Sequence, residues 1–242
     1  MQALQDNPLP DARGPLRQGA PRLHDAAYAY LKGLLLSGGL EPGDQISSER
    51  VGRALSMSRA PVSDAIRRLA VEGFFEILPQ IGCRVVRPVP AEVGDLYEIF
   101  GASEGVIARW AAERRSSGEA EEFRALCVSL ASEKGLPVAP NARFLELRRR
   151  NRRRYEMLHK LARSRLSTDS GETYWDRSDF YLRVAFGSRD LPRFVRGARA
   201  ALVDAVVAGD GDAAENATRR YLVRLGREVA DLLESQARER LG

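Results

Sequence analysis

The residues best suited to chemistry in this chain are polar and basic side chains at helical spacing between positions 46 and 86. One predicted helix begins at Ser58 and ends near Glu72, with a polar N-terminal end and an apolar face behind it. An arginine at such an end carries two parallel donors that can read guanine in the major groove. The polar candidates are Ser58, Arg59, Ser63 and Arg67, and the apolar face consists of Val62, Ala65, Ile66 and Leu69.

These side chains must be positioned by a helix, a tight turn, a second helix and a hairpin. The first helix is expected to begin with Ser47 or Ser48 as its N-cap. Strands are expected at 74–78 and 83–86, joined by residues 79–82. This order places one helix in a DNA groove and a wing beside it. The further candidate DNA contacts are Ser48 and Arg50 on the first helix, Gln80 and Gly82 in the wing, and the phosphate contact Arg84.

A basic helix by itself is more simply a solvated surface, so the complete order of elements carries the DNA interpretation. Composition permits a nucleic-acid partner without requiring one, because 38 Lys and Arg oppose 33 Asp and Glu for a net charge of +5. The two cysteines, Cys83 and Cys127, argue against a disulfide framework and favour the cytoplasm. No apolar run approaches the ~18 residues of a membrane span.

The 242 residues suffice for about two domains. The predicted fold is mainly α: an N-terminal winged helix-turn-helix with a small β-hairpin wing, then a C-terminal all-α bundle of about six helices. Helices are expected near 91–114, 118–134, 141–163, 170–187, 192–208 and 211–238. The expected segments are a disordered arm at 1–20, a DNA-binding domain at 21–87, a linker at 88–92 and an effector-binding and dimerisation domain at 93–240.

The front of the chain resembles the winged-helix domain of GntR-type bacterial transcription regulators, over roughly residues 23–87. This resemblance implies that Arg50 and Arg59 touch operator DNA and that the wing glycine, Gly82, enters the minor groove. Ser63 stands where the family usually has an arginine, and Ile81 where it usually has a basic residue. These departures predict a different operator sequence and a weaker salt dependence of binding. The matching pieces are Pro42-Gly43, Ser48-Glu49-Arg50, Ser58-Arg59-Ala60-Pro61-Val62, Ala65-Ile66-Arg67-Arg68-Leu69, Glu72-Gly73 and Gly82.

Residues 91–238 resemble the helical effector domain of the FadR subgroup, called FCD, through pieces such as Tyr174-Trp175-Asp176-Arg177-Ser178 and Ala205-Val206-Val207-Ala208-Gly209-Asp210. Many such domains hold a divalent metal with an acidic residue or Asn and three histidines. Imidazole nitrogens hold zinc or nickel at such sites, and here all three histidines are replaced, so no metal and no cofactor is expected. The resemblance places Asn151, Tyr155, Arg199 and Tyr221 at the ligand positions, and Phe100 where the first helix often has an arginine.

Two interpretations of this pocket remain open. In the first, Arg199 supplies the positive charge that a metal supplies elsewhere and pairs with an acidic ligand, while Asn151, Tyr155 and Tyr221 add hydrogen bonds. In the second, the pocket has closed, and Arg199 pairs with a buried carboxylate or points to solvent.

The run from Arg148 to Arg154 spans almost two helical turns. An inward stripe at helical spacing predicts that most of these arginines lie on the flanks and outer face of the helix. The stripe consists of Phe144, Leu147, Asn151, Tyr155 and Leu158. A solvated surface is the simpler interpretation, and an auxiliary DNA or RNA contact is the alternative.

The sequence thus predicts a cytoplasmic, homodimeric transcription regulator, more often a repressor in this family, which binds double-stranded operator DNA at an inverted repeat. A small carboxylate effector would shift its DNA affinity. An effector-independent DNA-binding or partner-binding regulator that has lost its pocket is the alternative. Catalysis is not expected, because the chain has no nucleophile–base arrangement, no phosphate-binding glycine loop and no paired carboxylates near two histidines.

Overall fold

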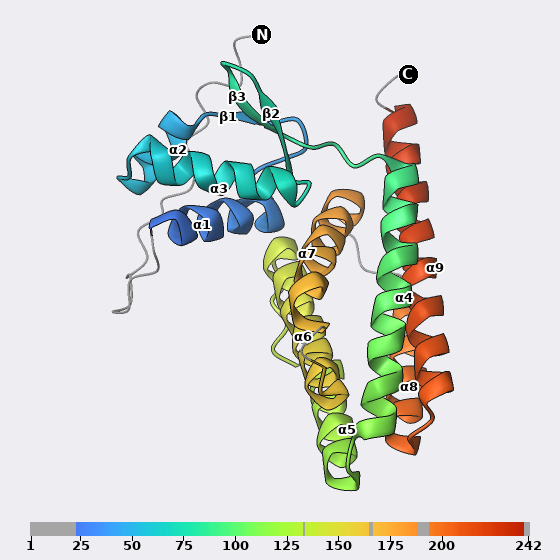
Figure 1. Cartoon of the computed structure of the whole chain (residues 1–242). Helices are drawn as coiled ribbons and strands as arrows, with labels where there is room; N and C mark the ends of the chain where they lie inside the picture. Colours follow the sequence, from blue (N-terminus) through green and yellow to red (C-terminus); the bar gives the residue numbers. More distant parts are fainter. Residues whose placement is uncertain (1–22, 133, 165–166, 188–193, 240–242) are drawn as a thin grey trace. The chain divides into compact units, whose positions relative to one another are not determined.

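The computed structural model describes residues 23–132, 134–164, 167–187 and 194–239, with side chains described from residue 25 onward and not for 165–171 or 188–197. The predicted arm at 1–20 lies outside these residues. The chain divides into two compact units between Pro88 and Val89, inside the segment expected to be a linker (Figure 1). Among the described helices, none combines the length and apolar character that crossing a membrane requires.

From residue 23 onward, the first unit contains three helices and a three-stranded antiparallel sheet of order β1-β3-β2. Strands β2 and β3 confirm the predicted hairpin. Strand β1 was not predicted, because two residues are too few to show an alternating pattern. The elements are α1 (Leu23–Ser37), β1 (Gln45–Ile46), α2 (Ser48–Leu55), α3 (Arg59–Val71), β2 (Phe75–Leu78) and β3 (Gly82–Val85).

The core of this unit forms where α1 packs against α3 and the sheet closes one end. Leu31 and Leu35 of α1, Leu69 of α3 and Phe74 before β2 are all fully buried. This single core holds α2, α3 and the wing in fixed relation to one another.

In the described residues of the second unit, the secondary structure consists of six helices joined by loops, which confirms the predicted bundle. Helix α4 begins at Pro90, where the missing N–H of proline costs nothing because it is not needed in the first helical turn. The helices are α4 (Pro90–Arg114), α5 (Ser117–Ala131), α6 (Pro140–Ala162), α7 (Ser167–Phe186), α8 (Phe194–Ala208) and α9 (Gly211–Glu239).

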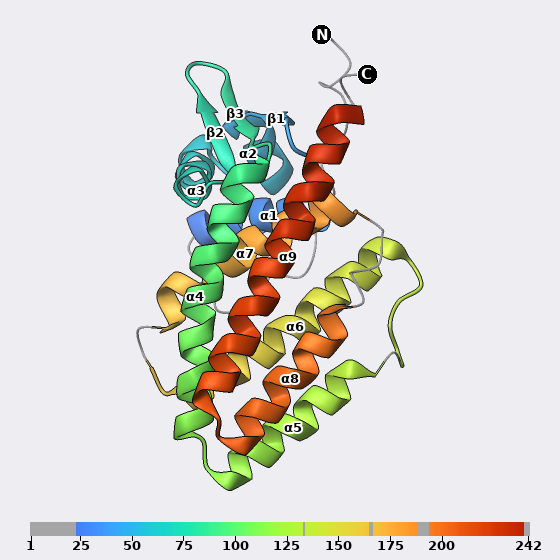
Figure 2. The ribbon, with the colours of Figure 1, turned by 90° about the vertical axis from the view of Figure 1, so that its right-hand side faces the viewer.

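Helices α4 and α9 lie side by side and run in opposite directions over most of their length (Figures 1 and 2). Gly226 of α9 permits this approach, because a Cβ atom there would lie 2.4 Å from the Cβ of Tyr97 in α4. The Tyr97 ring is fully buried, and its hydroxyl shares a hydrogen bond of 2.8 Å with Ser178 of α7. The α4–α9 pair therefore forms a scaffold on which α6, α7 and α8 pack, and α5 packs in turn against α6 and α8.

Candidate functional site

Helices α2 and α3 form a tight helix-turn-helix. Ser47 is the N-cap of α2, and its hydroxyl accepts a hydrogen bond from the Arg50 amide. Ser56 ends α2 in the left-handed conformation, and the Met57 amide bonds back to the Gly52 carbonyl at 2.8 Å. A Cβ on Gly52 would lie 2.8 Å from the Met57 carbonyl oxygen, so glycine is what lets the turn close.

The predicted polar face of α3 is exposed at its N-terminal end. Ser58 occupies the N-cap position, but its side chain makes no capping hydrogen bond. Ser58, Arg59 and Arg67 are exposed and Ser63 is partly so, while the predicted apolar face is buried. The structure thus places these four polar residues on one helix and leaves them accessible, as a groove-reading helix requires.

Three of the predicted DNA-contacting arginines form ion pairs with carboxylates that were not predicted from the sequence: Arg59, Arg67 and, in the wing, Arg84. Arg59 pairs with Glu49 of α2 at 2.7 Å, and both side chains are more than half exposed. Arg67 pairs with Asp64 one turn earlier on α3. The spacing of Asp64 and Arg67 could have revealed that pair. Exposed pairs of this kind contribute little, so phosphates or base edges can displace the carboxylates.

Gly82 and Arg84 lie on β3, the middle strand of the wing sheet. Arg84 pairs with Glu76 across the hairpin at 2.8 Å. Gly82 has a φ of 133°, and a Cβ there would lie 2.4 Å from the Ile46 carbonyl oxygen of β1. Glycine is therefore needed for the sheet itself, in addition to any contact with DNA. Gln80 and Ile81 are exposed at the turn.

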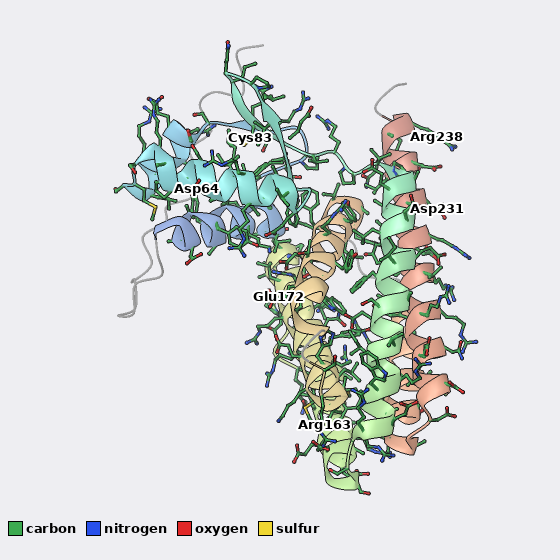
Figure 3. The ribbon with its side chains drawn as sticks, viewed as in Figure 1. Asp64, Cys83, Arg163, Glu172, Asp231 and Arg238 are labelled. Carbon is green, nitrogen blue, oxygen red and sulfur yellow. The ribbon has the colours of Figure 1, made fainter. Side chains whose placement is uncertain are left out.

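Cys83 is buried in the wing, with its thiol 3.7 Å from the Ile46 carbonyl oxygen (Figure 3). Burial raises the pKa of the Cys83 thiol to about 12. A thiol in this state is unreactive, and Cys83 serves as part of the core.

The second candidate site is a small cavity inside the helical unit. Its volume of about 30 Å³ leaves room for one or two water molecules, since a water needs roughly 10–15 Å³. Three of the five residues proposed for an effector pocket line it: Asn151, Arg199 and Tyr221. The other described lining residues are Phe144, Leu147, Arg148, Asp179, Leu182 and Leu225.

Phe100 and Tyr155, the other two predicted pocket residues, lie in an aromatic cluster rather than in the described lining of this cavity. Phe100 is fully buried and meets the Trp175 ring edge-on at 4.7 Å between centroids. Tyr155 is 4% exposed, with its ring 4.1 Å from Trp175. Burial raises the pKa of the Tyr155 hydroxyl well above its usual range.

One buried polar cluster was not predicted from the sequence. Glu104 of α4 is 1% exposed, and both of its carboxylate oxygens lie 3.0 Å from Nε2 of His159. The indole of Trp175 donates to Glu104 at 3.1 Å. The three residues come from α4, α6 and α7, and their wide separation in sequence left no pattern to detect. These hydrogen bonds satisfy the polar atoms of the buried Glu104 side chain.

The arginine run is not a solvated face, and that prediction was wrong for most of the run. Arg148 and Arg152 pair with Asp179 at 2.5 and 3.1 Å, and Arg152 pairs with Asp176 at 2.5 Å. Both aspartates belong to α7 and are nearly buried. Within the run only Arg149 and Arg153 are exposed; Arg148, Arg150, Arg152 and Arg154 are wholly or partly buried.

The cavity does not suit the metal that the FCD resemblance implies. The Asn151 side-chain oxygen accepts a hydrogen bond from Arg154 at 3.0 Å and a long one from Arg199 at 3.4 Å. An oxygen facing guanidinium groups is not placed to ligate a cation, and Arg199 would repel one. In the parts of the chain that the structure describes, no group of three or more His, Cys, Asp or Glu side chains could hold a metal ion.

Comparison with known proteins follows the two-unit division. Residues 23–85 match the family described as "Bacterial regulatory proteins, gntR family", and residues 95–224 match the FCD domain. A curated relative from Agrobacterium vitis, an uncharacterized HTH-type transcriptional regulator in the TAR-I ttuE-ttuC' intergenic region, is 34% identical over 101 residues, which are 42% of this chain and 58% of the relative.

Two other HTH-type regulators are similar. One, in an unstable DNA locus of Streptomyces ambofaciens, is 35% identical over 28% of this chain and 29% of its own length. The first two curated relatives are therefore covered over 58% and 29% of their lengths. The uncharacterized regulator YdfH of Escherichia coli is 23% identical over 90% of this chain and 93% of its own.

Two solved structures share the fold. McbR/YncC of E. coli superposes with a TM-score of 0.66 at 20% identity, covering 90% of this chain and 100% of that one. A putative GntR transcriptional regulator from Rhodococcus sp. RHA1 gives a TM-score of 0.65 at 16% identity, covering 85% and 96%. With the FCD match spanning more than half of the residues and the winged helix ahead of it, this chain belongs to the gntR family of bacterial regulatory proteins, with an FCD domain consistent with the FadR subgroup.

Proposed function

We propose that this chain is a cytoplasmic transcription regulator, most simply a repressor, that binds an inverted-repeat operator as a homodimer. The observation that carries the proposal is the exposed N-terminal end of α3, with Arg59 at its first turn and a wing in the same unit. Twofold symmetry of the dimer would present two such helices to two half-sites.

The DNA test begins by selecting binding sites from random duplexes with the full chain. Selected sites should contain two inverted half-sites. Arg59→Ala should then lower affinity for the selected operator by about 10- to 100-fold, which is the usual effect of losing a bidentate base contact. Arg124→Ala, at an exposed arginine of α5, is the matched control and should leave affinity unchanged. Failure to enrich any sequence would contradict the proposal.

An auxiliary DNA contact would involve Arg149 and Arg153, because they are the exposed arginines of the run. Charge reversal of both should leave the salt dependence of operator binding unchanged if they only face solvent. A reduced slope of log affinity against log salt would assign them a phosphate contact.

We further propose that a small acidic metabolite in the helical unit modulates DNA affinity. The presence of Arg199, Asn151 and Tyr221 around one cavity supports this, and the small volume of the cavity requires the helices around it to move apart for most ligands. Thermal-shift screening of small carboxylic acids against wild type and Arg199→Ala tests it. An operator affinity that no stabilising acid alters would favour the alternative, an effector-independent regulator.

A further inference from the structure

Two arginines of the helical unit converge without a carboxylate between them. Arg154 of α6 is 3% exposed, and its Nη1 donates to the Asn151 side-chain oxygen at 3.0 Å. Arg199 of α8 reaches the same oxygen with Nη2 at 3.4 Å. Among the described residues, the recorded hydrogen bonds of both guanidiniums go to the Asn151 amide and neither forms an ion pair with a carboxylate, and the Nε atoms of both are buried without a hydrogen-bond partner.

No negatively charged side chain among the described residues pairs with the guanidiniums of Arg154 and Arg199. Burial, and then the nearby Arg199, lower the pKa of the Arg154 guanidinium, yet arginine stays protonated in proteins. Arg154 is buried and Arg199 is partly buried, and two like charges shielded from water in this way are costly unless an opposite charge lies between them. The Asn151 oxygen carries only a partial charge, and the Cys127 thiol, which also contacts Arg154, is a weak acceptor.

The adjoining cavity limits what the missing partner can be. Arg148 in its wall is already paired with Asp179 at 2.5 Å, so Arg199 supplies the unmatched charge of the described lining. Phe144, Leu147 and Leu182 make much of the remaining wall apolar. A second anionic group on the ligand would meet Asp179, so the site favours a single negative charge.

We propose that Arg154 and Arg199 together form an anion site for a small monocarboxylate. The two carboxylate oxygens would take the place of the Asn151 oxygen as bridging acceptors, and a short apolar tail would contact Phe144 and Leu147. This inference rests on the proposed effector site and goes beyond it, because it adds Arg154 as the second cation and sets the charge of the ligand. The paired guanidiniums provide the charge-assisted bonds that hold carboxylates most strongly.

The test measures the thermal midpoint of the full chain with sodium propionate, succinate, phosphate or chloride at matched ionic strength. Propionate should raise the midpoint of wild type saturably, by about 2–6 °C. Arg154→Gln and Arg199→Gln should each lose this shift, and their midpoints without ligand should not fall, because like-charge repulsion is removed. Arg153→Gln, at the exposed neighbour of Arg154, should keep the full shift.

Equal propionate shifts in wild type and Arg154→Gln would overturn the site. Equal shifts with chloride and propionate would overturn the carboxylate assignment, and a larger shift with succinate would overturn the preference for one charge. Should Arg154→Gln fail to fold, the arginine Nε–H resonances of wild type provide a second measurement. Two of them, one missing in Arg199→Gln, should move on titration with propionate, and unmoved resonances would overturn the site.

Operator affinity measured in parallel separates this inference from the proposed function. A propionate-induced thermal shift without a change in operator affinity would leave the anion site standing and refute effector control.

Discussion

Asp179 connects two neighbouring turns of α6 to α7. Its Oδ2 atom lies 2.5 Å from Arg148 and 3.1 Å from Arg152, and its side chain is 5% exposed. Burial raises the pKa of this carboxyl and the two arginines lower it, with burial the larger effect. The two charge-assisted contacts with arginine therefore offset only part of the cost of burying the ionised carboxylate.

Replacing Asp179 with Asn should destabilise the helical unit by on the order of 2–3 kcal/mol. This is somewhat less than the usual cost of breaking a buried pair, because both arginines retain partial contact with water. Urea unfolding followed by circular dichroism measures the change. Glu121→Gln, which breaks an exposed pair with Arg124, should have almost no effect. A similar loss of unfolding free energy in both variants would show that the buried ion pairs of Asp179 contribute no more than an exposed pair.

Residues that line the cavity could be named from the sequence, but the ion pairs of the neighbouring arginines could not. The family resemblance singled out Asn151, Arg199 and Tyr221, and all three line one cavity. The burial of the arginine run was missed because Asp176 and Asp179 lie 24 to 31 residues further along the chain. Helical periodicity assigns a face to each residue, but it does not show which distant element covers that face.

At the scale of the elements, the α4–α9 contact depends on glycine in α9. Gly226→Ala should destabilise the protein by about 1–3 kcal/mol, because the new methyl group would overlap the fully buried Tyr97. Gly94→Ala in α4 is the matched control, since nothing lies within 4 Å of a Cβ there. It should stabilise the helix by about 0.5–1 kcal/mol. Unfolding midpoints in urea compare the two, and changes of the same sign would refute this account of the packing.

Helix α5 begins with a capping box that makes its stability depend on pH. Glu119 accepts a hydrogen bond from the Ser116 amide, which is the main reason that the pKa of its carboxyl is lowered, with Ser116 Oγ and Arg163 contributing. A lowered folded-state pKa gives stability that is present above the unfolded pKa and is lost as pH falls through the folded one. Glu119→Gln should therefore lower the thermal midpoint near neutral pH.

The same substitution should have a shrinking effect below the ordinary glutamate range, where wild type is protonated as well. Thermal melts across that pH range check this, with Glu122→Gln in α5 as the control. A constant difference at every pH would mean that the carboxylate charge is not what Ser116 recognises.

The helices of the second unit could be predicted because apolar residues recur at helical spacing over several turns in each of them. All six helices of the second unit correspond to the predicted segments. In the first unit the hairpin was predicted and β1 was not, since its existence depends on Ile46 pairing with Cys83 across 37 residues. The family resemblance predicted a DNA contact for Gly82. The structure gives a separate reason for glycine at this position, because β1 approaches too closely to leave room for a Cβ atom.

At the scale of the whole molecule, each unit contains one buried thiol. Cys83 lies in the first unit and Cys127 in the second, and burial raises the pKa of both, for Cys127 against the opposing effect of Arg154. Neither thiol should react with a disulfide reagent in the native state. Pulsed labelling along a urea titration should then report the unfolding of each unit separately.

We expect the two thiols to become reactive at different urea concentrations, because each unit has its own core. Peptide mass spectrometry assigns the labels, with Cys83→Ala and Cys127→Ala as single-thiol controls. Coincident transitions at every protein concentration would show that the units unfold as one.

The carboxylates beside Arg59, Arg67 and Arg84 bear on how the protein would search a chromosome. Every encounter with DNA must displace these carboxylates, and only the correct base sequence returns a specific contact for each arginine. The penalty is small for each pair, but it applies at every one of the ~10⁶–10⁹ competing sites in a genome. By weakening attachment to random sequence more than to the operator, these acidic neighbours would keep more of the protein available to find its site.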